Sequence, residues 1–417
     1  MSAAPPTCAF CASALDPIMD FGEVALAGAF LEPAQFASER KYRLRLAYCS
    51  RCYAVQVPDI VDADVLFRDY FYFSSAIGTL RRHFEQYAAE ITKRFLRSSD
   101  AAVLEFGCND GVLLRPLADQ GVRTVIGVDP AANVLASIDD ERLTLVNGFF
   151  DEPTAARVVA EHGEIDIVMA NNVYAHIPNI NETTRAVRRV LKKDGVFVFE
   201  VHYLGKVIEE MQYDMIYHEH LYYYSLLSAI EHFARYDMRV FDIKPIPIHG
   251  GSLRFYVGRA DGRYGGVESE AVSALREQER SKGFDRYETF LRFSERVDAH
   301  RMELMQLLRR LRAEGRSIAG YGASGRANTI IQYCGIDASH LDYVVDDAPA
   351  KHHFYTPGSH LEIRPREVLD TDRRPDYVLV FAWSFFEEIR RRNSAYLSSG
   401  GKMILPLPKL QVVSAPL

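Results

Sequence analysis

The sequence predicts an α/β protein in which a small cysteine-pinned module precedes two Rossmann-like α/β units. Three observations predict this fold. Two C-x-x-C motifs lie within residues 8–52. Apolar strand-like segments alternate with helical segments over residues 102–257, and a second run of this kind follows residue 317. In each run, a glycine-rich loop follows the first strand-like segment. Strands separated by helices indicate a parallel sheet that is covered on both faces.

The N-terminal module is defined by its cysteines. Cys8 and Cys11 form one C-x-x-C motif, and Cys49 and Cys52 form the other. In a reducing compartment, two such motifs indicate a tetrahedral Zn(Cys)4 site rather than disulfides. Four thiolates leave no open coordination position, so the zinc is predicted to be structural. The alternative is a redox dithiol pair, but neither motif has the strand and helix of a thioredoxin-like site. We place this zinc-binding domain at residues 1–70.

The middle unit, which we place at residues 71–285, begins with a helical pattern around residues 81–87. A helix is also expected from about residue 112. The predicted strands are residues 102–106, 124–129, 143–146, 165–170, 195–201, 240–243 and 252–257. The last two of these segments are expected to close the parallel sheet.

The C-terminal unit, placed at residues 286–417, follows a charged, helix-periodic stretch over residues 269–312. That stretch has hardly a glycine or proline and predicts long connecting helices. The predicted strands of the C-terminal unit are residues 317–320, 341–347, 377–381 and 402–406. The two units are similar in layout, but they show no clean sequence repeat.

The first glycine loop, residues 105–111, has the form E-x-G-x-x-x-G. Its spacing differs from the G-x-G-x-x-G loop that holds a pyrophosphate. S-adenosylmethionine (SAM) has no phosphate, and Asp129 ends the next strand, where a carboxylate can bond both ribose hydroxyls. We therefore predict a SAM site; the alternative is an ordinary strand–turn–helix with two turn glycines. The expected cofactor-binding residues are Glu105, Gly107, Asn109, Gly111, Asp129, Asn171 and Asn172.

The second glycine loop, residues 320–325, matches G-x-G-x-x-G after a strand, and Asp346 and Asp347 lie about twenty residues further on. This pattern is typical of a nicotinamide or flavin site. Arg326 follows the loop at once and suits a diphosphate of any kind. Three interpretations remain open, namely a dinucleotide, a nucleotide-sugar diphosphate, which we favour, and a simple turn that opens a helix.

Residues 217–224 carry two histidines, one carboxylate and several phenols with little between them. Histidine suits acid–base catalysis because its pKa lies near neutrality. Such a segment can remove a proton from carbon beside a ketone, which is what carbon methylation requires. Two alternatives remain. The segment could be an aromatic strand, with Tyr217 and Glu219 on one face and His218 and His220 on the other. It could also bind a metal with one of three further histidines, His176, His202 or His249.

Composition limits the classes of partner. The chain has 417 residues, a net charge of −7 and a pI of about 6.0, so no overall basic field attracts nucleic acid or an anionic membrane. No apolar run reaches the roughly 18 residues that span a bilayer. The N-terminus has neither a positive start nor an apolar segment typical of a signal peptide. We expect a cytoplasmic protein that binds neither nucleic acid nor membrane and is a monomer or weak dimer.

Over its whole length the chain resembles the sugar C-methyltransferases of deoxysugar biosynthesis. These enzymes methylate C3 of dTDP-linked 4-keto sugars that lead to tetronitrose, kijanose and mycarose. The resemblance rests on the two C-x-x-C motifs and on the following segments: residues 105–111, 171–176, 216–225, 248–254, 321–328 and 381–383. It implies a zinc domain, a SAM domain and a C-terminal α/β domain, with the nucleotide sugar between the last two.

The resemblance also implies residue roles. His220 corresponds to the family's proposed base, and Tyr217 and Glu219 to residues that line the sugar and support that base. His176 is expected to hold the enolate oxygen, and Tyr72 to close over the substrates. Arg326 stands where the family has a lysine, which keeps a cation for the diphosphate but changes its geometry. The expected substrate-binding residues are Tyr222, His249, Ser252, Arg254, Tyr321, Ala323, Ser324, Arg326 and Asn328.

The sequence therefore predicts a SAM-dependent methyltransferase that acts on C3 of a dTDP-linked 4-keto-deoxysugar through His220 and an enolate. Three alternatives remain. They are a C5-methyltransferase, an NAD-dependent nucleotide-sugar oxidoreductase that uses residues 320–325, and a zinc-ribbon scaffold that recognises a partner protein.

Overall fold

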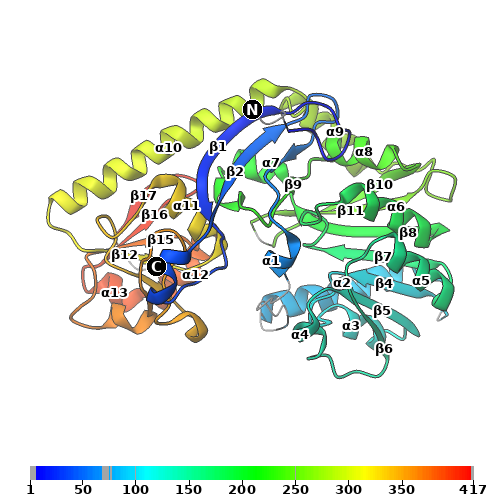
Figure 1. Ribbon diagram of the computed structural model, residues 1–417, viewed down its shortest axis with the longest axis horizontal. Coiled ribbons are helices and arrows are strands. Elements are labelled where there is room, and N and C mark those ends of the chain that lie inside the picture. Colours follow the sequence, from blue (N-terminus) through cyan, green and yellow to red (C-terminus); the bar gives the residue numbers. More distant parts are fainter. Residues whose placement is uncertain (1–5, 68–74, 76–77, 99, 249, 415–417) are drawn as a thin grey trace.

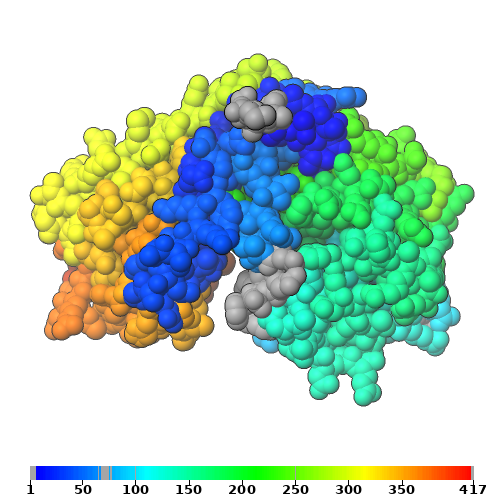
Figure 2. Space-filling model, in the orientation of Figure 1, coloured from blue at the N-terminus to red at the C-terminus, as the bar shows by residue number. Residues whose placement is uncertain are grey.

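The computed structural model describes residues 6–67, 75, 78–98, 100–248 and 250–414 (Figure 1). Tyr72 and His249, two of the expected substrate contacts, lie outside the described residues. An N-terminal sheet lies between a middle lobe and a C-terminal lobe, and Figure 2 shows the surface hollowed between these two lobes. The predicted α/β class and its three parts are confirmed. No helix in the described ranges is both long and apolar enough to cross a bilayer.

The N-terminal sheet has the strand order β1-β2-β3-β9. Its strands are β1 (Asp16–Ala25), β2 (Lys41–Tyr48), β3 (Val55–Gln56) and β9 (Tyr222–Tyr223), with η1 (Pro33–Ser38) and α1 (Ala63–Phe67) beside them. All neighbouring strands pair antiparallel. Because β9 comes from the middle of the chain, the segment just after His220 is a strand of the cysteine-pinned module.

The middle lobe holds a seven-stranded sheet of order β10-β11-β8-β7-β4-β5-β6. Its parallel strands are β4 (Ala102–Phe106), β5 (Thr124–Asp129), β6 (Leu143–Asn147), β7 (Ile165–Asn171) and β8 (Leu191–His202). The antiparallel strands β10 (Met238–Ile246) and β11 (Ser252–Arg259) close it, as predicted.

Side chains alternate along these strands, so each strand contributes residues to two cores, one on each face of the sheet. Val103 and Val198 face a core with α2 (Gly78–Phe95) and α3 (Leu114–Asp119). Leu104 and Phe199 face the opposite core, which also receives the first cysteine motif. The helices on that side are α5 (Glu152–His162), α6 (Ile180–Val190) and α8 (Leu226–Ala234). The remaining helical elements of this lobe are α4 (Ala132–Leu135), α7 (Leu204–Glu209) and η3 (Tyr213–Met215).

Two helices lead to the C-terminal lobe, α9 (Glu270–Ser281) and the long α10 (Tyr287–Ala313), as the charged stretch predicts (Figure 1). The C-terminal sheet has the order β14-β13-β12-β15-β16-β17. These strands are β12 (Ile318–Tyr321), β13 (Val344–Asp346), β14 (Ile363–Pro365), β15 (Tyr377–Val380), β16 (Lys402–Leu405) and β17 (Gln411–Val413). The helical elements are α11 (Gly325–Cys334), η4 (Pro349–Lys351), η5 (Arg366–Asp370), η6 (Trp383–Phe385), α12 (Phe386–Arg392) and α13 (Ser394–Ser398). All pairs in this sheet are parallel except β16 with β17.

One core joins the N-terminal sheet to the C-terminal lobe. Leu44 and Tyr48 of β2 share it with Phe290 of α10 and Ile330 of α11. The N-terminal module is therefore packed against both lobes, since its cysteines lie in the core of the middle lobe.

Candidate active site

The four predicted zinc ligands converge. The Sγ atoms of Cys8 and Cys52 lie 3.5 Å apart, as do those of Cys11 and Cys49, and all four lie within 4.8 Å of one another. Zn–S bonds of about 2.3 Å in a tetrahedron place sulfurs roughly 3.8 Å apart, so the set fits one Zn²⁺. Among the residues that the structure describes, this is the one cluster of three or more metal-binding side chains.

A side chain beside the cysteines orients one of them. The Gln56 Nε2 group donates to Cys8 Sγ at 3.1 Å, and the Gln56 Oε1 atom accepts from the backbone N–H of Ala9 at 2.9 Å. Such contacts fix the orientation of a metal ligand. Gln56 belongs to β3 and pairs with Tyr222 of β9, so the zinc loop is connected directly to the strand that follows His220.

The first glycine loop has the backbone that its sequence predicts. Gly107 has φ +66°, and a Cβ there would lie 2.6 Å from Val173. Asn109 (φ 50°) and Gly111 (φ +73°) are also left-handed, so the chain turns sharply before α3. The Asp129 carboxylate accepts from the backbone N–H groups of Asn109 and Ala131, each at 2.9 Å. These bonds hold the Asp129 carboxylate at the mouth of the loop.

Several buried polar atoms around this loop lack partners within the described part of the chain. The Asn171 Nδ2 group donates to Glu105 Oε1 at 2.8 Å, which leaves Glu105 Oε2 and Asn171 Oδ1 without a hydrogen bond. Asp110 Oδ2 accepts from the Ser75 backbone N–H at 3.1 Å, whereas Asp110 Oδ1 is unpaired. Buried polar atoms are normally satisfied. These acceptors fit the amino and hydroxyl donors of SAM.

Burial raises the pKa of Glu105 to about 8, since desolvation disfavours its charged form. Asn172 follows at the end of β7 with φ 54°, and its N–H donates to the Glu200 carbonyl at 2.9 Å. Asn171 and Asn172 thus close the loop at the carboxyl edge of the parallel strands, where ligands of such sheets bind.

Residues 217–220 form a turn, closed by a bond from the His220 N–H to the Tyr217 carbonyl at 2.9 Å. The turn brings the side chains together: the Tyr217 hydroxyl lies 3.0 Å from His220 Nε2, and His220 Nδ1 lies 2.8 Å from the Met215 carbonyl. The alternative of an extended aromatic strand is therefore wrong for residues 217–220, and only β9 is a strand in this segment. The first histidine of the turn, His218, is buried with its Nε2 3.0 Å from the Arg43 carbonyl.

His176, in the loop that follows β7, lies beside His220 of the turn. Their ring centroids are 4.9 Å apart. Backbone bonds from Leu221 and Tyr222 to the Ala175 carbonyl, at 2.9 and 3.2 Å, fix this arrangement. Desolvation, with the neighbouring His220 as a second cause, holds the pKa of His176 well below its ordinary value. His176 is therefore a neutral imidazole at physiological pH, able to donate one hydrogen bond. Burial also raises the pKa of Glu219, to about 7.

The second glycine loop packs on this turn. A Cβ on Gly325 would lie 3.5 Å from the ring of Tyr217. Arg326 lies over the Trp383 ring at 4.8 Å, and its Nε donates to Asp214 Oδ2 at 2.7 Å. The Ser324 side chain caps α11 by accepting from the Ala327 N–H at 3.3 Å.

The acidic residues near the second glycine loop are hydrogen-bonded to other groups of the protein. Tyr321 donates to Asp347 at 2.9 Å. Asp346, the acid expected to hold a dinucleotide ribose, accepts from the Ala323 N–H at 2.7 Å and from Lys351 Nζ at 3.2 Å. Asn328 donates to the Ala25 carbonyl at 3.1 Å. The charge of Asp346 is therefore already paired.

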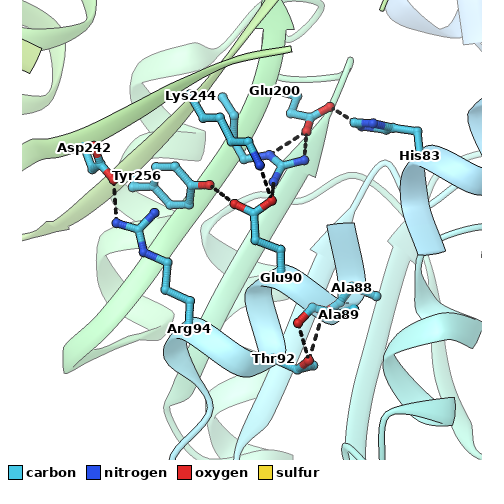
Figure 3. A network of polar contacts seen from close by, with 11 residues as sticks. His83, Ala88, Ala89, Glu90, Thr92, Arg94, Glu200, Asp242, Lys244 and Tyr256 are labelled. Carbon is cyan, nitrogen blue, oxygen red and sulfur yellow. Dashed lines mark hydrogen bonds and ion pairs between the residues drawn. The ribbon is translucent and has the colours of Figure 1, made fainter. Parts of the chain in front are cut away.

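Three expected substrate contacts are buried and hydrogen-bonded to other groups of the protein. The Tyr222 hydroxyl donates to the Pro178 carbonyl at 3.1 Å, and the Ser252 hydroxyl to the Ile248 carbonyl at 3.4 Å. Arg254 is 1% exposed, and its guanidinium bonds to the carboxylates of Glu200 and Glu90. Figure 3 shows Glu90 and Glu200 in this network, with His83 bonded to Glu200. Arg254 therefore has a structural role in this network, and its expected contact with the substrate stays a prediction.

Glu200→Ala tests this structural role. The Glu200 side chain is fully buried and balances Arg254, so its removal is expected to lower the free energy of unfolding by about 3–5 kcal/mol. Urea denaturation measures this change. Arg123→Ala is the matched control, since Arg123 and Asp100 form an exposed pair expected to contribute under about 1 kcal/mol. Equal effects for the two variants would contradict the assignment.

Four groups at this site could not be assigned a role from the sequence: the Met215 carbonyl, Asp214, Trp383 and Lys351. The Met215 carbonyl is a backbone group and carries no side-chain signal. Asp214 precedes the segment 216–225 and Trp383 ends the segment 381–383, but their contact joins residues that are 169 apart in sequence. Lys351 has no motif around it.

Comparisons with known proteins agree with this geometry. A C-methyltransferase C-terminal domain matches residues 247–408, a methyltransferase domain matches residues 80–242, and a zinc binding domain matches residues 8–67. The chain is 31% identical to the C-methyltransferase NovU of Streptomyces niveus over 95% of its own length and 94% of that protein's. This protein belongs to the sugar C-methyltransferase family. It is a SAM-dependent C-methyltransferase, and its four cysteines form a structural zinc site.

Two further proteins are similar to only a part of this C-methyltransferase. The ubiquinone biosynthesis O-methyltransferase of Bartonella tribocorum is 33% identical over 97 residues, which are 22% of this chain and 38% of that protein. The structure of the glycopeptide N-methyltransferase MtfA with bound SAM is 15% identical and covers 46% of this chain and 96% of its own, with a TM-score of 0.34.

Proposed function

We propose that this enzyme methylates C3 of a dTDP-linked 4-keto-deoxysugar after His220 removes the C3 proton. The observation that carries the proposal is the position of the His220 ring, whose two nitrogens contact the Met215 carbonyl and the Tyr217 hydroxyl. A carbonyl only accepts hydrogen bonds, so Nδ1 bears the hydrogen and Nε2 bears the lone pair. Nε2 is thus the basic nitrogen.

In the proposed reaction, the C3 proton and the electron pair of the C3–H bond move to defined atoms. The C3 proton passes to Nε2 of His220, and the electrons of the C–H bond form an enolate whose charge lies on the ketone oxygen. The Tyr217 hydroxyl turns from Nε2 to donate to that oxygen. His176 adds a second donor, since its imidazole is neutral and 4.9 Å from the His220 ring. Preorganised donors of this kind stabilise an enolate strongly.

Glu105, Asn109, Asp129 and Asn171 are the residues that would hold SAM, together with Gly107, Gly111 and Asn172. When bound, SAM supplies an electrophilic methyl group. The protein's own contribution is to hold the enolate carbon in line with that group, which alone is worth several powers of ten in rate.

SAM binding is expected to release close to one proton per site at pH 7. Glu105 has a pKa of about 8 in the free protein, so it is mostly protonated at pH 7. Hydrogen-bond donors of SAM favour the ionised form, which lowers this pKa and tightens binding as pH rises toward 8. Calorimetry in buffers of different ionisation enthalpy measures the proton count. An enthalpy that does not depend on the buffer, or a Glu105→Gln variant that releases the same proton, would contradict this expectation.

The second glycine loop is proposed to hold the nucleotide diphosphate through Arg326, Asn328 and the backbone of Ala323 and Ser324, with Tyr321 nearby. Arg326 Nη2 is buried and has no hydrogen bond to any described residue, so a bound anion would satisfy it. Tyr72 and Glu219 complete the proposed sugar site. The expected location in the cytoplasm is part of the same proposal.

The proposal is tested with SAM carrying a ¹³C methyl group and a panel of dTDP- and UDP-linked 4-keto sugars. Two-dimensional NMR of the product identifies the ring carbon that bears the label. We expect turnover of a dTDP-linked 4-keto-deoxysugar with the label on C3. A label on C5, or turnover only with UDP-linked sugars, would replace the proposed substrate.

A further inference from the structure

Asp214 is a fully buried carboxylate in the short helix η3, and it joins this helix to the C-terminal lobe. Its Oδ2 atom accepts two hydrogen bonds, from Arg326 Nε at 2.7 Å and from the indole Nε1 of Trp383 at 2.8 Å. Its exposed fraction is 0%. Neither Asp214 Oδ1 nor Arg326 Nη2 has a hydrogen-bond partner among the described residues. A buried ion pair is weak evidence for stability, and in some proteins such pairs are retained because they specify one conformation.

The residues that follow Asp214 contact the base directly. The carbonyl of Met215 accepts from His220 Nδ1 at 2.8 Å and from the Tyr223 hydroxyl at 3.1 Å. The carbonyl of Ile216 accepts from the Thr329 hydroxyl of α11 at 3.0 Å. Two adjacent carbonyls thus face opposite partners, one the base and the other the C-terminal lobe.

Tyr213, just before Asp214, contacts that lobe as well. Its hydroxyl lies 3.3 Å from His300 Nδ1 of α10, and His300 Nε2 lies 2.7 Å from the Pro406 carbonyl. The segment of residues 213–216 is therefore fixed by residues that belong to, or lead into, the C-terminal lobe. The base itself comes from the middle lobe's side of the chain.

We propose that Asp214 is a positioning residue of the methyl transfer. Its carboxylate holds the turn of residues 213–216 against Arg326 and Trp383, and this fixes the Met215 carbonyl that keeps the hydrogen of His220 on Nδ1. The inference rests on the proposed role of His220 as base. It adds that the orientation and tautomer of the base depend on the second glycine loop, whose Arg326 is the proposed diphosphate contact.

Asp214 can hold this segment because one of its oxygens accepts hydrogen bonds from two donors. A carboxylate attracts a guanidinium and an indole N–H together, and the charge makes both bonds stronger than bonds to a neutral amide. An asparagine at position 214 keeps the shape but loses the charge. The turn is then held less firmly, the Met215 carbonyl moves from Nδ1, and the hydrogen of His220 redistributes between its two nitrogens. A displacement of about 1 Å in a catalytic group lowers the rate by roughly 10²-fold.

The test compares Asp214→Asn and Trp383→Phe with Glu39→Gln in the full-length enzyme. Trp383→Phe removes one donor and keeps an aromatic ring. Glu39 is the matched control because its side chain is only 7% exposed and has two bonds to the C-terminal lobe, to the Gly358 N–H at 2.7 Å and to His360 at 2.9 Å. Neither of these bonds involves residues 213–216. The measurements are kcat, KM for the nucleotide sugar, the Kd of SAM, and the ¹⁵N spectrum of the His220 ring.

We expect Asp214→Asn to lower kcat about 10- to 100-fold and Trp383→Phe about 3- to 10-fold, with the Kd of SAM within twofold of wild type. The ¹⁵N spectrum should show His220 as a mixture of tautomers in both variants and as the Nδ1–H form in Glu39→Gln. If Asp214→Asn does not fold, Trp383→Phe decides the question. A folded variant that keeps kcat within twofold and the wild-type tautomer would overturn the inference. In that case, the activity of His220→Asn separates the two proposals. If His220→Asn also retained turnover, the proposed function would fail as well. If His220→Asn were inactive, the proposed function would stand and only the role of Asp214 would fail.

Discussion

His220→Asn is expected to lower kcat by a factor of about 10² to 10⁴ while the protein stays folded and binds SAM normally. General acid–base groups typically contribute this much to a rate. Asparagine can still donate to the Met215 carbonyl that now accepts from His220 Nδ1 at 2.8 Å. It has no nitrogen that takes up a proton near neutral pH. The variant therefore removes the base and leaves the hydrogen bond that holds the turn.

His218→Gln is the control for this experiment, because it changes the other histidine of the same turn. His218 Nε2 contacts the Arg43 carbonyl at 3.0 Å, in the N-terminal sheet, and a glutamine amide can make the same bond. We expect its kcat to stay within about fivefold of wild type. Similar losses in the two variants would mean that the turn tolerates no change, and that His220 has no special chemical role.

Cys11→Ser is expected to remove the zinc, lower the melting temperature and reduce kcat by at least tenfold. Structural zinc contributes roughly 10–16 kcal/mol of apparent binding free energy in small zinc domains, which is comparable to the whole stability of a typical domain. The effect reaches the active site through the sheet, since Gln56 of β3 contacts Cys8 and pairs with Tyr222, two residues after His220. The SAM loop is built from the middle lobe alone, so the Kd of SAM should change little.

Cys11→His is the matched variant for the zinc experiment. Histidine is a common zinc ligand, and Cys11 is the partly exposed member of the four, which leaves room for the larger ring. This variant should keep one zinc per chain and most of the activity. Metal analysis and thermal unfolding of both variants measure the outcome. If Cys11→Ser lost its zinc but melted and turned over like wild type, the zinc would have no structural role.

The parts of the fold that could be predicted from the sequence are those whose signal is local. Residues 102–106 and 165–170 are short apolar runs bounded by turns, and both are buried strands of the parallel sheet. The four cysteines were identified as zinc ligands from their spacing, and the structure brings them within 4.8 Å of one another. A left-handed loop at Gly107 and Gly111 follows from glycine itself.

The rest could not be predicted because it depends on contacts between distant residues. The pattern of residues 217–220 suits an extended strand as well as a turn, and the turn is fixed by His218 against Arg43, 175 residues away. Arg254 lies in a motif that suggested a substrate contact. Its burial depends on Glu90, which is 164 residues away and carries no signal of its own.

The measurement that tests the central claim most directly is hydrogen exchange at the sugar ring. The enzyme is incubated in D₂O with the dTDP-linked 4-keto sugar and S-adenosylhomocysteine, so that proton removal occurs without methyl transfer. NMR follows the loss of each ring hydrogen. We predict that wild-type enzyme exchanges the C3 hydrogen and that His220→Asn does not, while His218→Gln does. Exchange at C3 that persists in His220→Asn, or exchange at C5 instead, would contradict the assignment of His220 as the base that acts on C3.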